Sequence, residues 1–290
     1  MSRRRPNLYS HDEDKSEFLK IFRDLCRTRQ PWEVWTDLMS VMACSISNSV
    51  DQTEKRFNSR EKEYADCIKR LGGNEKAAQL FAIIVMALEK NPDQDYLGAL
   101  YMQLELGNHW KGQYFTPYHA SQVMAELTLV NSKELIENDG WISICDPCIG
   151  GGAMMIAAAN TFRRQEINYQ DQVLFAGQDI DRVASMMAYI QLSLLGCPGY
   201  IVVGNCLTNP IVGQALFPVE QEGQELWYTP FYFSEVWHYR RQFKMMDLLF
   251  RADGQSAVPE SEPINLRTGF LFEFFPEEET HVKEDQEEWI

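Results

Sequence analysis

Residues 141–153 read Trp-Ile-Ser-Ile-Cys-Asp-Pro-Cys-Ile-Gly-Gly-Gly-Ala, and this stretch decides the predicted fold. An apolar run ends at Asp146 and Pro147, and three glycines then precede a run of small residues. The pattern predicts a strand, a tight turn and a helix start, where open α/β sheets bind nucleotide-like ligands. Gly150 and Gly152 would let the backbone approach a ligand, and Asp146 could accept hydrogen bonds from an amino group. Because glycine-rich turns also cap helices without a ligand, both interpretations of this segment alone stand.

Downstream segments continue the alternation of strand and helix. The pattern predicts helices over 153–164 and 182–195 and strands over 141–145, 173–177 and 200–203. Such alternation is typical of a mostly parallel sheet with helices on both faces, which binds ligands beyond the carboxyl ends of its strands. Each expected strand ends in polar or turn residues, which are Asp146-Pro147, Gln178-Asp179 and Asn205. We therefore expect these side chains to converge at one edge of the sheet.

These polar residues indicate a class of ligand. Asp179 is placed to accept both hydroxyls of a ribose, and the carboxamide of Asn205 offers one acceptor and two donors to an adenine edge. The triplet Gly150-Gly151-Gly152 departs from the Gly-x-Gly-x-x-Gly pattern of pyrophosphate sites. The sequence therefore favours an adenosine ligand without a pyrophosphate, and S-adenosylmethionine is the leading candidate.

The chain before about residue 107 is typical of helices instead. Apolar residues recur at helical spacing from Phe18 to Cys26 and from Trp32 to Met42, and Pro31 is placed to open the second helix. Further helices are expected over 51–70, 75–89 and 96–106. We expect a helical bundle that packs on a catalytic domain or on a partner protein.

Composition limits the environment and the partners. The chain has 290 residues, 45% of them hydrophobic, and a formal net charge of −15, which argues against a broad nucleic-acid surface. No apolar run reaches about eighteen residues and no signal-peptide core is apparent, so we expect a cytoplasmic protein without a membrane span. The seven cysteines fit reduced thiols. Cys145 and Cys148 lack a second pair, so no metal site is expected.

Four motifs follow one another between about residues 108 and 210. They are Gly112-Gln113-Tyr114-Phe115-Thr116-Pro117, Asp146-Pro147-Cys148-Ile149-Gly150-Gly151-Gly152, Gly177-Gln178-Asp179-Ile180-Asp181 and Gly204-Asn205-Cys206-Leu207. In order and spacing they resemble the modification subunits of type I restriction systems and related N6-adenine DNA methyltransferases. The resemblance implies a Rossmann-like, S-adenosylmethionine-dependent methyltransferase domain of the α/β class over 108–275, after a helical N-terminal domain over 1–107 and before an acidic tail over 276–290.

The resemblance also implies roles for single residues. The first motif would cover the methionine part of the cofactor, Asp146 and Gly150 would lie along it, and Asp179 would hold the ribose. The family usually has an acidic residue where Asn205 stands, so adenine recognition would be altered. The full set of expected cofactor-binding residues is Tyr114, Phe115, Thr116, Pro117, Asp146, Pro147, Gly150, Gly152, Asp179, Ile180, Asn205 and Cys206.

The main departure from the family is an absent motif. Related enzymes carry Asn-Pro-Pro followed by an aromatic residue, in which the Asn accepts the hydrogens of the target amine and the ring stacks on the flipped base. No Asn-Pro-Pro occurs in this chain, and the nearest candidate by position is Tyr228, Thr229, Pro230 and Phe231. Without the carboxamide, we expect transfer to be badly weakened or absent.

Two functions therefore stay open. The first is an active or partner-dependent adenine methyltransferase that reaches DNA through a separate specificity or partner subunit, and association into oligomers is compatible with the sequence. The second is a pseudoenzyme that acts as a binding module in a larger assembly. Methylation of a protein or a small molecule fits the acidic charge but not the ordered motifs.

Residues 227–250 gather aromatic and basic side chains in this acidic chain. Aromatic rings interleaved with Arg and Lys suit stacking and phosphate contacts with a splayed nucleotide strand. Aromatic stripes are more often core packing, with the basic residues on the solvent face of a helix, and we favour this interpretation.

Overall fold

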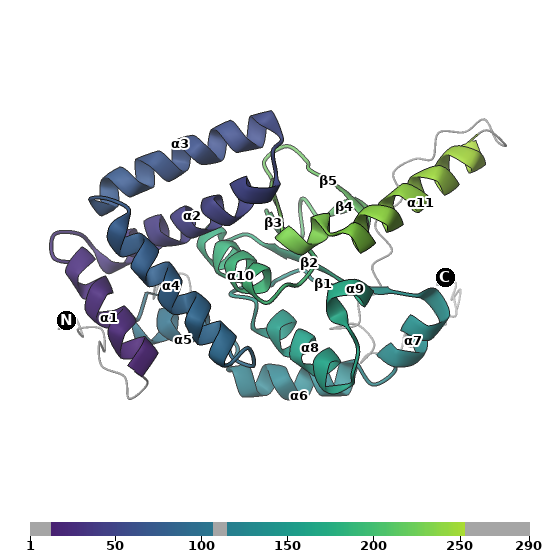
Figure 1. Ribbon diagram of the computed structural model, residues 1–290, viewed down its shortest axis with the longest axis horizontal. Helices are drawn as coiled ribbons and strands as arrows, with labels where there is room; N and C mark the ends of the chain where they lie inside the picture. The colour runs from purple at the N-terminus through teal and green to yellow at the C-terminus, as the bar shows by residue number, and fades with distance from the viewer. Residues whose placement is uncertain (1–12, 107–114, 253–290) are drawn as a thin grey trace, which may run out of the picture.

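The computed structural model describes residues 13–106 and 115–252 (Figure 1). The helices that precede the sheet are α1 (Glu13–Leu25), α2 (Pro31–Val50), α3 (Glu54–Leu71), α4 (Glu75–Lys90), α5 (Tyr96–Gln103), α6 (Tyr118–Thr128) and α7 (Ser132–Asp139). The helical character expected before residue 107 is confirmed over the described part. Pro31 opens α2, and Gly72 ends α3 in the left-handed region with a φ of 80°.

Two features of the helices differ from the prediction. The helix α2 continues beyond Met42 to Val50, because most of its side chains are buried and its helical periodicity is blurred. The helices α6 and α7 were not anticipated. Large apolar side chains of α6, such as Val123 and Leu127, are exposed rather than packed, so its pattern lacks one clear apolar face.

The central sheet has four strands in the order β1-β2-β3-β6. The strands β1 (Ile142–Asp146), β2 (Val173–Asp179) and β3 (Gly199–Val203) are parallel, whereas β6 (Glu225–Tyr228) is antiparallel to β3. The helices between these strands are α8 (Ala153–Arg164), α9 (Tyr169–Gln172) and α10 (Arg182–Leu194). The predicted alternation is thus confirmed, with α8 at the expected bounds. The remaining elements are β4 (Val212–Gln214), β5 (Phe217–Val219), the 3-10 helix η1 (Pro230–Phe233) and α11 (Glu235–Ala252).

The two faces of the sheet belong to two apolar cores. Along β2, Val173 and Phe175 face the core that includes α8, α10 and the N-terminal helices. The alternate residues Leu174 and Ala176 face a second core that includes Trp237 of α11. Because side chains alternate along a strand, such a buried run needs cover on both sides. The chain therefore has the predicted α/β fold with helices on both faces of a mostly parallel sheet.

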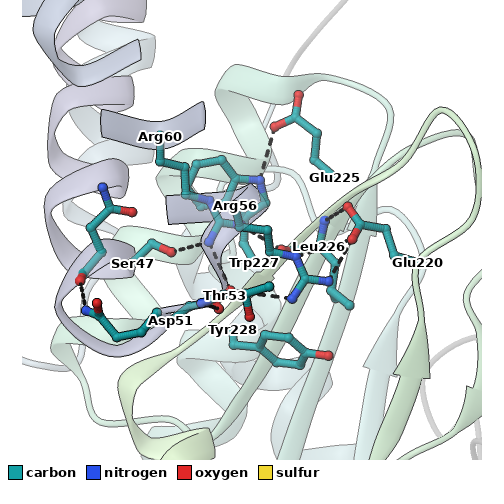
Figure 2. A network of polar contacts seen from close by, with 12 residues as sticks. Ser47, Asp51, Thr53, Arg56, Arg60, Glu220, Glu225, Leu226, Trp227 and Tyr228 are labelled. Carbon is teal, nitrogen blue, oxygen red and sulfur yellow. Dashed lines mark hydrogen bonds and ion pairs between the residues drawn. The ribbon is translucent and has the colours of Figure 1, made fainter. Parts of the chain in front are cut away.

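An arginine cluster ties α3 to β6 (Figure 2). The buried Arg60 donates hydrogen bonds to Ser47 Oγ at 2.5 Å, to Asp51 Oδ2 at 3.1 Å and to the carbonyl of Leu226 at 2.8 Å. Its guanidinium carbon lies 4.0 Å from the ring centroid of Trp227. Arg60 thus finds acceptors both on the helices and on the sheet. The helical part and the sheet are therefore held together by polar contacts as well as by the shared core.

The cysteines and the length of the helices bear on the environment of the chain. All seven cysteines are free thiols, as predicted. Within the described ranges, none of the helices combines the length and the apolar character that crossing a membrane requires. The acidic tail over 276–290 lies outside the described residues. The boundary expected at residue 107 stays a prediction.

Candidate cofactor site

A cavity of about 560 Å³ lies at the carboxyl ends of β1 and β2, beside the start of α8. It is lined by Phe115, Thr116, Asp146, Cys148, Ile149, Gly150, Gly151, Ala153, Met154, Asp179, Ile180, Asp181 and Ala184. This is the edge of the sheet at which the sequence predicts a ligand. We call this cavity the carboxylate pocket, since three of its lining residues are aspartates.

The glycine turn forms one wall of the pocket and is bound to the end of β2. The backbone N–H of Gly150 donates to Asp179 Oδ2 at 2.9 Å, and the N–H of Ile149 donates to the carbonyl of Gln178 at 3.0 Å. Gly150 has a φ of 53°, and a Cβ there would lie 3.3 Å from Phe115 Cδ1. Both the backbone conformation and the close ring therefore favour glycine at this position.

Gly152 has a different role from the one expected. A Cβ at this position would lie 3.2 Å from Ala188 Cα, and the residue is not among those that line the pocket. Its φ of 93° places it in the left-handed region at the start of α8. Gly152 thus allows α8 to pack closely on α10, whereas Gly150 shapes the pocket wall.

The aspartates of the pocket are held by backbone amides. Asp146 Oδ1 accepts from the N–H of Cys148 at 3.0 Å, and Asp179 Oδ1 accepts from the N–H of Asp181 at 2.8 Å. Asp181 in turn caps α10 by accepting from Val183 and Ala184. Each carboxylate oxygen has two lone pairs, so these contacts leave acceptor capacity for a ligand.

The electrostatics of the pocket favour a particular ligand charge. Burial, and next the negative charge of Asp179, raise the pKa of Asp146, although the hydrogen bond from Cys148 opposes the shift. No Lys, Arg or His is among the described residues that line the pocket. A ligand that brings positive charge or hydrogen-bond donors would relieve this repulsion, whereas a phosphate would add to it.

A buried glutamine supports the glycine turn from behind. Gln191 Nε2 donates to the carbonyl of Gly151 at 2.9 Å and to Asp95 Oδ1 at 2.8 Å, and Gln191 Oε1 accepts from the N–H of Leu97 at 3.0 Å. The contacts connect α10 with the turn and with the start of α5. Sequence reasoning missed Gln191, because a single Gln in an apolar helix carries no local signal of its partners.

The structure brings half of the expected cofactor-binding residues to the pocket. Those that line it are Phe115, Thr116, Asp146, Gly150, Asp179 and Ile180. Pro117 is the N-cap of α6 and Pro147 lies in the turn after β1, and neither lines the pocket. Tyr114 lies outside the described residues. The pocket residues that the prediction missed belong to the glycine motif, to the first turn of α8 and to the start of α10; they are Cys148, Ile149, Gly151, Ala153, Met154, Asp181 and Ala184.

Asn205 and Cys206 do not line the pocket, although they follow β3 as expected. Asn205 Oδ1 accepts from the backbone N–H of Leu207 at 2.9 Å and of Thr208 at 3.3 Å, so its carboxamide stabilises the turn. Cys206 Sγ lies 3.9 Å from Cys148 Sγ, and Cys148 is a lining residue. Cys206 is therefore at the rim of the pocket rather than inside it.

The candidate substrate motif Tyr228–Phe231 lies at the opposite edge of the sheet. Because β6 is antiparallel to β3, Tyr228 pairs with Tyr200 at the amino end of β3. Thr229 Oγ1 donates to the carbonyl of Cys197 at 2.7 Å and accepts from the N–H of Gly199 at 2.9 Å. The five residues of β3, at roughly 3.3 Å each, span about 15 Å, and this length separates Tyr228 from the end of the strand at which the pocket lies. The structure therefore does not bring this segment to the carboxylate pocket, because β6 is antiparallel to β3, and its role as a substrate motif stays a prediction.

The aromatic and basic residues after β6 divide into two groups. Trp227, Tyr232 and Trp237 are buried as core packing, whereas Phe231, Phe233, Tyr239 and Phe243 are exposed, so the favoured interpretation holds for only part of the group. Arg240 lies over the ring of Trp237, and Arg241 donates to the carbonyl of Tyr232 at 2.6 Å, so these guanidiniums are bound to the body of the protein. Lys244 is half-exposed and pairs with Asp247 at 3.6 Å, so none of these three cations is poised beside the exposed rings as a nucleotide platform would require.

Comparison with known proteins identifies the family. Residues 93–251 match the family model described as N-6 DNA Methylase, which is more than half of the chain. The chain belongs to this family. The matched range includes the glycine turn, the end of β2 and the carboxylate pocket, so the pocket lies in the part of the chain that defines an N-6 DNA methylase.

Solved structures with some likeness to this chain are larger proteins. One is the methyltransferase subunit of a type I restriction-modification system from Streptococcus thermophilus, with 17% identity, a TM-score of 0.35, and coverage of 69% of this chain and 45% of that one. Another is a putative class I S-adenosylmethionine-dependent methyltransferase from Listeria monocytogenes, with 15% identity, a TM-score of 0.37, and coverage of 69% and 56%. The chain spans about half the length of these proteins. No curated protein sequence matches it.

Proposed function

We propose that the carboxylate pocket binds S-adenosylmethionine. The observation that carries this proposal is the set of three aspartates around a glycine turn without a cationic side chain among the lining residues. S-adenosylmethionine brings an ammonium group, a sulfonium and two ribose hydroxyls, and it has no phosphate. The pocket therefore fits it better than a nucleoside phosphate, which would meet like charge.

Each wall of the pocket has a role in this proposal. Asp179 would accept the ribose hydroxyls with the lone pairs that Gly150 and Asp181 leave free. Asp146 would accept hydrogen bonds from the ammonium group, and Phe115 and Thr116 would cover the ligand and exclude water. When bound, the cofactor supplies an electrophilic methyl group. The residues of this chain hold and orient it.

We further propose that methyl transfer to adenine N6 in DNA depends on a partner. Membership of the N-6 DNA methylase family supports adenine as the target. The separation of Tyr228–Phe231 from the pocket supports the need for a further group that accepts the hydrogens of the target amine. A specificity subunit would supply both this group and the recognition of DNA, as the net charge of −15 disfavours binding of DNA by this chain alone. The free thiols support a cytoplasmic location.

The same separation favours a second candidate, a pseudoenzyme that keeps the cofactor pocket and acts as a binding module. Transfer of a tritiated methyl group to adenine-containing DNA distinguishes the two functions. Incorporation that appears only when proteins of the source cell are added supports the partner-dependent enzyme, and its absence under all conditions supports the pseudoenzyme.

Selectivity among ligands tests the cofactor proposal itself. S-adenosylmethionine and S-adenosylhomocysteine should raise the melting temperature of the intact chain, whereas ATP should leave it unchanged, because its phosphates would face Asp146, Asp179 and Asp181. A shift with ATP that equals the shift with S-adenosylmethionine would contradict the proposed basis of selectivity.

A further inference from the structure

The helix α11 carries an apolar stripe on the side that faces away from the protein. Trp237, Arg240 and Arg241 fix its first half to the body, while the helix extends beyond the sheet (Figure 1). The opposite side carries large apolar side chains at alternating spacings of four and three residues, which we call the α11 stripe: Tyr239, Phe243, Met246 and Phe250.

Exposure of the stripe is unusual for a single chain. Tyr239 is 59% exposed, Phe243 66%, Met246 43% and Phe250 76%, although all lie on one helix face. Contiguous apolar patches on soluble proteins commonly mark interaction sites. The alternating four-and-three spacing is that of the a and d positions of a coiled coil, which a second helix covers by inserting its own side chains.

The structure assigns a second copy of this chain as the occupant of the α11 stripe. A two-fold axis through the middle of the helix would place Phe243 against Met246 of the other copy and Tyr239 against its Phe250. Such an interface uses the same patch twice, so the spacing of the stripe is complementary to itself. Aromatic rings would meet a thioether in one layer and a ring in the other, both of which are favourable contacts.

The area agrees with a reversible dimer. The stripe and the flanking Leu249 are 43 to 76% exposed, whereas the exposed Met245 points away from the stripe. At roughly 100 Å² for each of these five large side chains, one copy buries about 500 Å² and the pair about 1,000 Å². This value is in the range of weak, transient protein interfaces, so we expect a dimer that dissociates on dilution.

Nucleic acid fits the stripe less well than a second copy does. The exposed side chains of the stripe are apolar or phenolic, and the nearby Arg240 and Arg241 already contact carbonyl groups of the body. Neither guanidinium is therefore available to a phosphate without the loss of an internal hydrogen bond. The interface between copies needs no such loss, because it buries apolar and aromatic side chains of the stripe.

Sedimentation velocity of the full chain over a range of concentrations tests the assignment. We expect twice the mass of one chain at high concentration and one mass on dilution. Phe243→Glu should weaken association at least 10-fold, because it would place two carboxylates in the apolar interface. Leu127→Glu on α6 is the matched control, since Leu127 is 70% exposed but lies outside the stripe, and it should associate like the wild type.

Three results would overturn the assignment. A wild type that stays monomeric at every concentration would show that residues outside the described ranges or a different protein cover the stripe. A dimer that persists in Phe243→Glu would place the interface elsewhere. Equal loss of association in Phe243→Glu and Leu127→Glu would point to a general effect of added negative charge. Circular dichroism of both variants checks that the fold is kept.

Discussion

The carboxylate of Asp179 accepts a hydrogen bond from the backbone N–H of Gly150, with 2.9 Å between Oδ2 and N. The contact joins the end of β2 to the glycine turn after β1, so two segments of the pocket wall move as one. It also positions the carboxylate that we propose for the ribose before any ligand arrives. Preorganised acceptors of this kind reduce the ordering cost of binding.

Replacement of Gly150 should affect both the fold and the pocket. Gly150→Ala puts a Cβ 3.3 Å from Phe115 Cδ1 and forces a φ of 53° on an L-residue. We expect a loss of about 1–2 kcal/mol in the free energy of unfolding and weaker binding of S-adenosylmethionine. Urea denaturation and calorimetry measure the two effects.

A glycine elsewhere provides the control for this substitution. Gly72 has a φ of 80°, and a Cβ there would meet nothing within 4 Å. Gly72→Ala should therefore cost a similar amount of stability through the backbone alone and leave ligand binding unchanged. If Gly72→Ala weakened binding as much as Gly150→Ala did, the effect would come from lost stability rather than from the shape of the pocket.

Asp146→Asn should have opposite effects on stability and on ligand binding. Burial and the charge of Asp179 raise the pKa of Asp146 above its usual value of 3.8. A raised pKa means that the native state binds this proton more tightly than the unfolded state does, so the stabilising contribution is present at low pH. It is lost as the pH rises through the native pKa, and above that point the carboxylate costs stability.

The Asn variant should therefore unfold at higher urea concentration than the wild type at pH 7. It should also bind S-adenosylmethionine more weakly, because the ammonium loses a charged partner. Affinity of the wild type should fall as the pH drops through the raised pKa, and this dependence should be reduced in the variant. Stability and affinity that change in the same direction would contradict the role given to Asp146.

Loss of the Gln191 side chain should destabilise the glycine turn, because Gln191 donates to the carbonyl of Gly151. Gln191→Leu leaves the carbonyl of Gly151 without a donor and the N–H of Leu97 without an acceptor. It also removes one of the two donors to the buried carboxyl of Asp95, which keeps the bond from the N–H of Gly98. We expect a cost of about 2–4 kcal/mol in the free energy of unfolding, measured by urea denaturation. Gln165→Leu is a suitable comparison, since Gln165 makes a 3.3 Å contact with the carbonyl of Leu129 at a half-buried site. A similarly small decrease in the free energy of unfolding in both variants would contradict the proposal that Gln191 stabilises the glycine turn.

The arginine cluster predicts a difference between two neighbouring arginines. Although burial opposes the shift, hydrogen bonds from Thr53 and the charges of Arg56 and Arg60 hold the pKa of Asp51 below its usual range. Arg60→Ala removes the buried partner of Asp51 and leaves the carbonyl of Leu226 without its donor. We therefore expect the free energy of unfolding to fall by about 3–5 kcal/mol.

Arg56 is more exposed, and its ion pair with Glu220 lies near the surface. Arg56→Ala should therefore cost only about 1 kcal/mol, as measured by urea denaturation at pH 7. The stability that Asp51 contributes in the wild type should fall as the pH drops through its lowered native pKa. Equal losses in the two Arg→Ala variants would show that burial of Arg60 carries no additional energy.

Local patterns in the sequence predicted much of the fold. The apolar run before Asp146, the glycine turn and the small residues after it determine β1 and α8, because strand period, turn chemistry and helix propensity agree there. The start of β2 at Val173 was predicted, although the strand continues two residues beyond the predicted end to Asp179. These elements place Asp146, Gly150 and Asp179 at one edge of the sheet.

Contacts between segments far apart in the sequence could not be predicted from such local patterns. The strand β6 follows the β4–β5 hairpin and runs antiparallel to β3, so the position of Tyr228–Phe231 could not be inferred from their spacing after β3. Similarly, Gln191 finds Gly151 and Asp95 only in the folded chain. Asn205 was expected at a ligand, but Asn often binds the backbone two residues ahead of it in turns.

Calorimetric titration of S-adenosylmethionine into the intact chain and into Asp179→Ala tests the central claim most directly. The account predicts saturable binding to the wild type and a loss of affinity of about 10-fold or more in the variant, equivalent to about 1.4 kcal/mol. Glu134→Ala, which removes an exposed carboxylate of α7, should bind like the wild type. Absence of binding to the wild type, or equal affinity in Asp179→Ala, would contradict the assignment of the carboxylate pocket as the cofactor site.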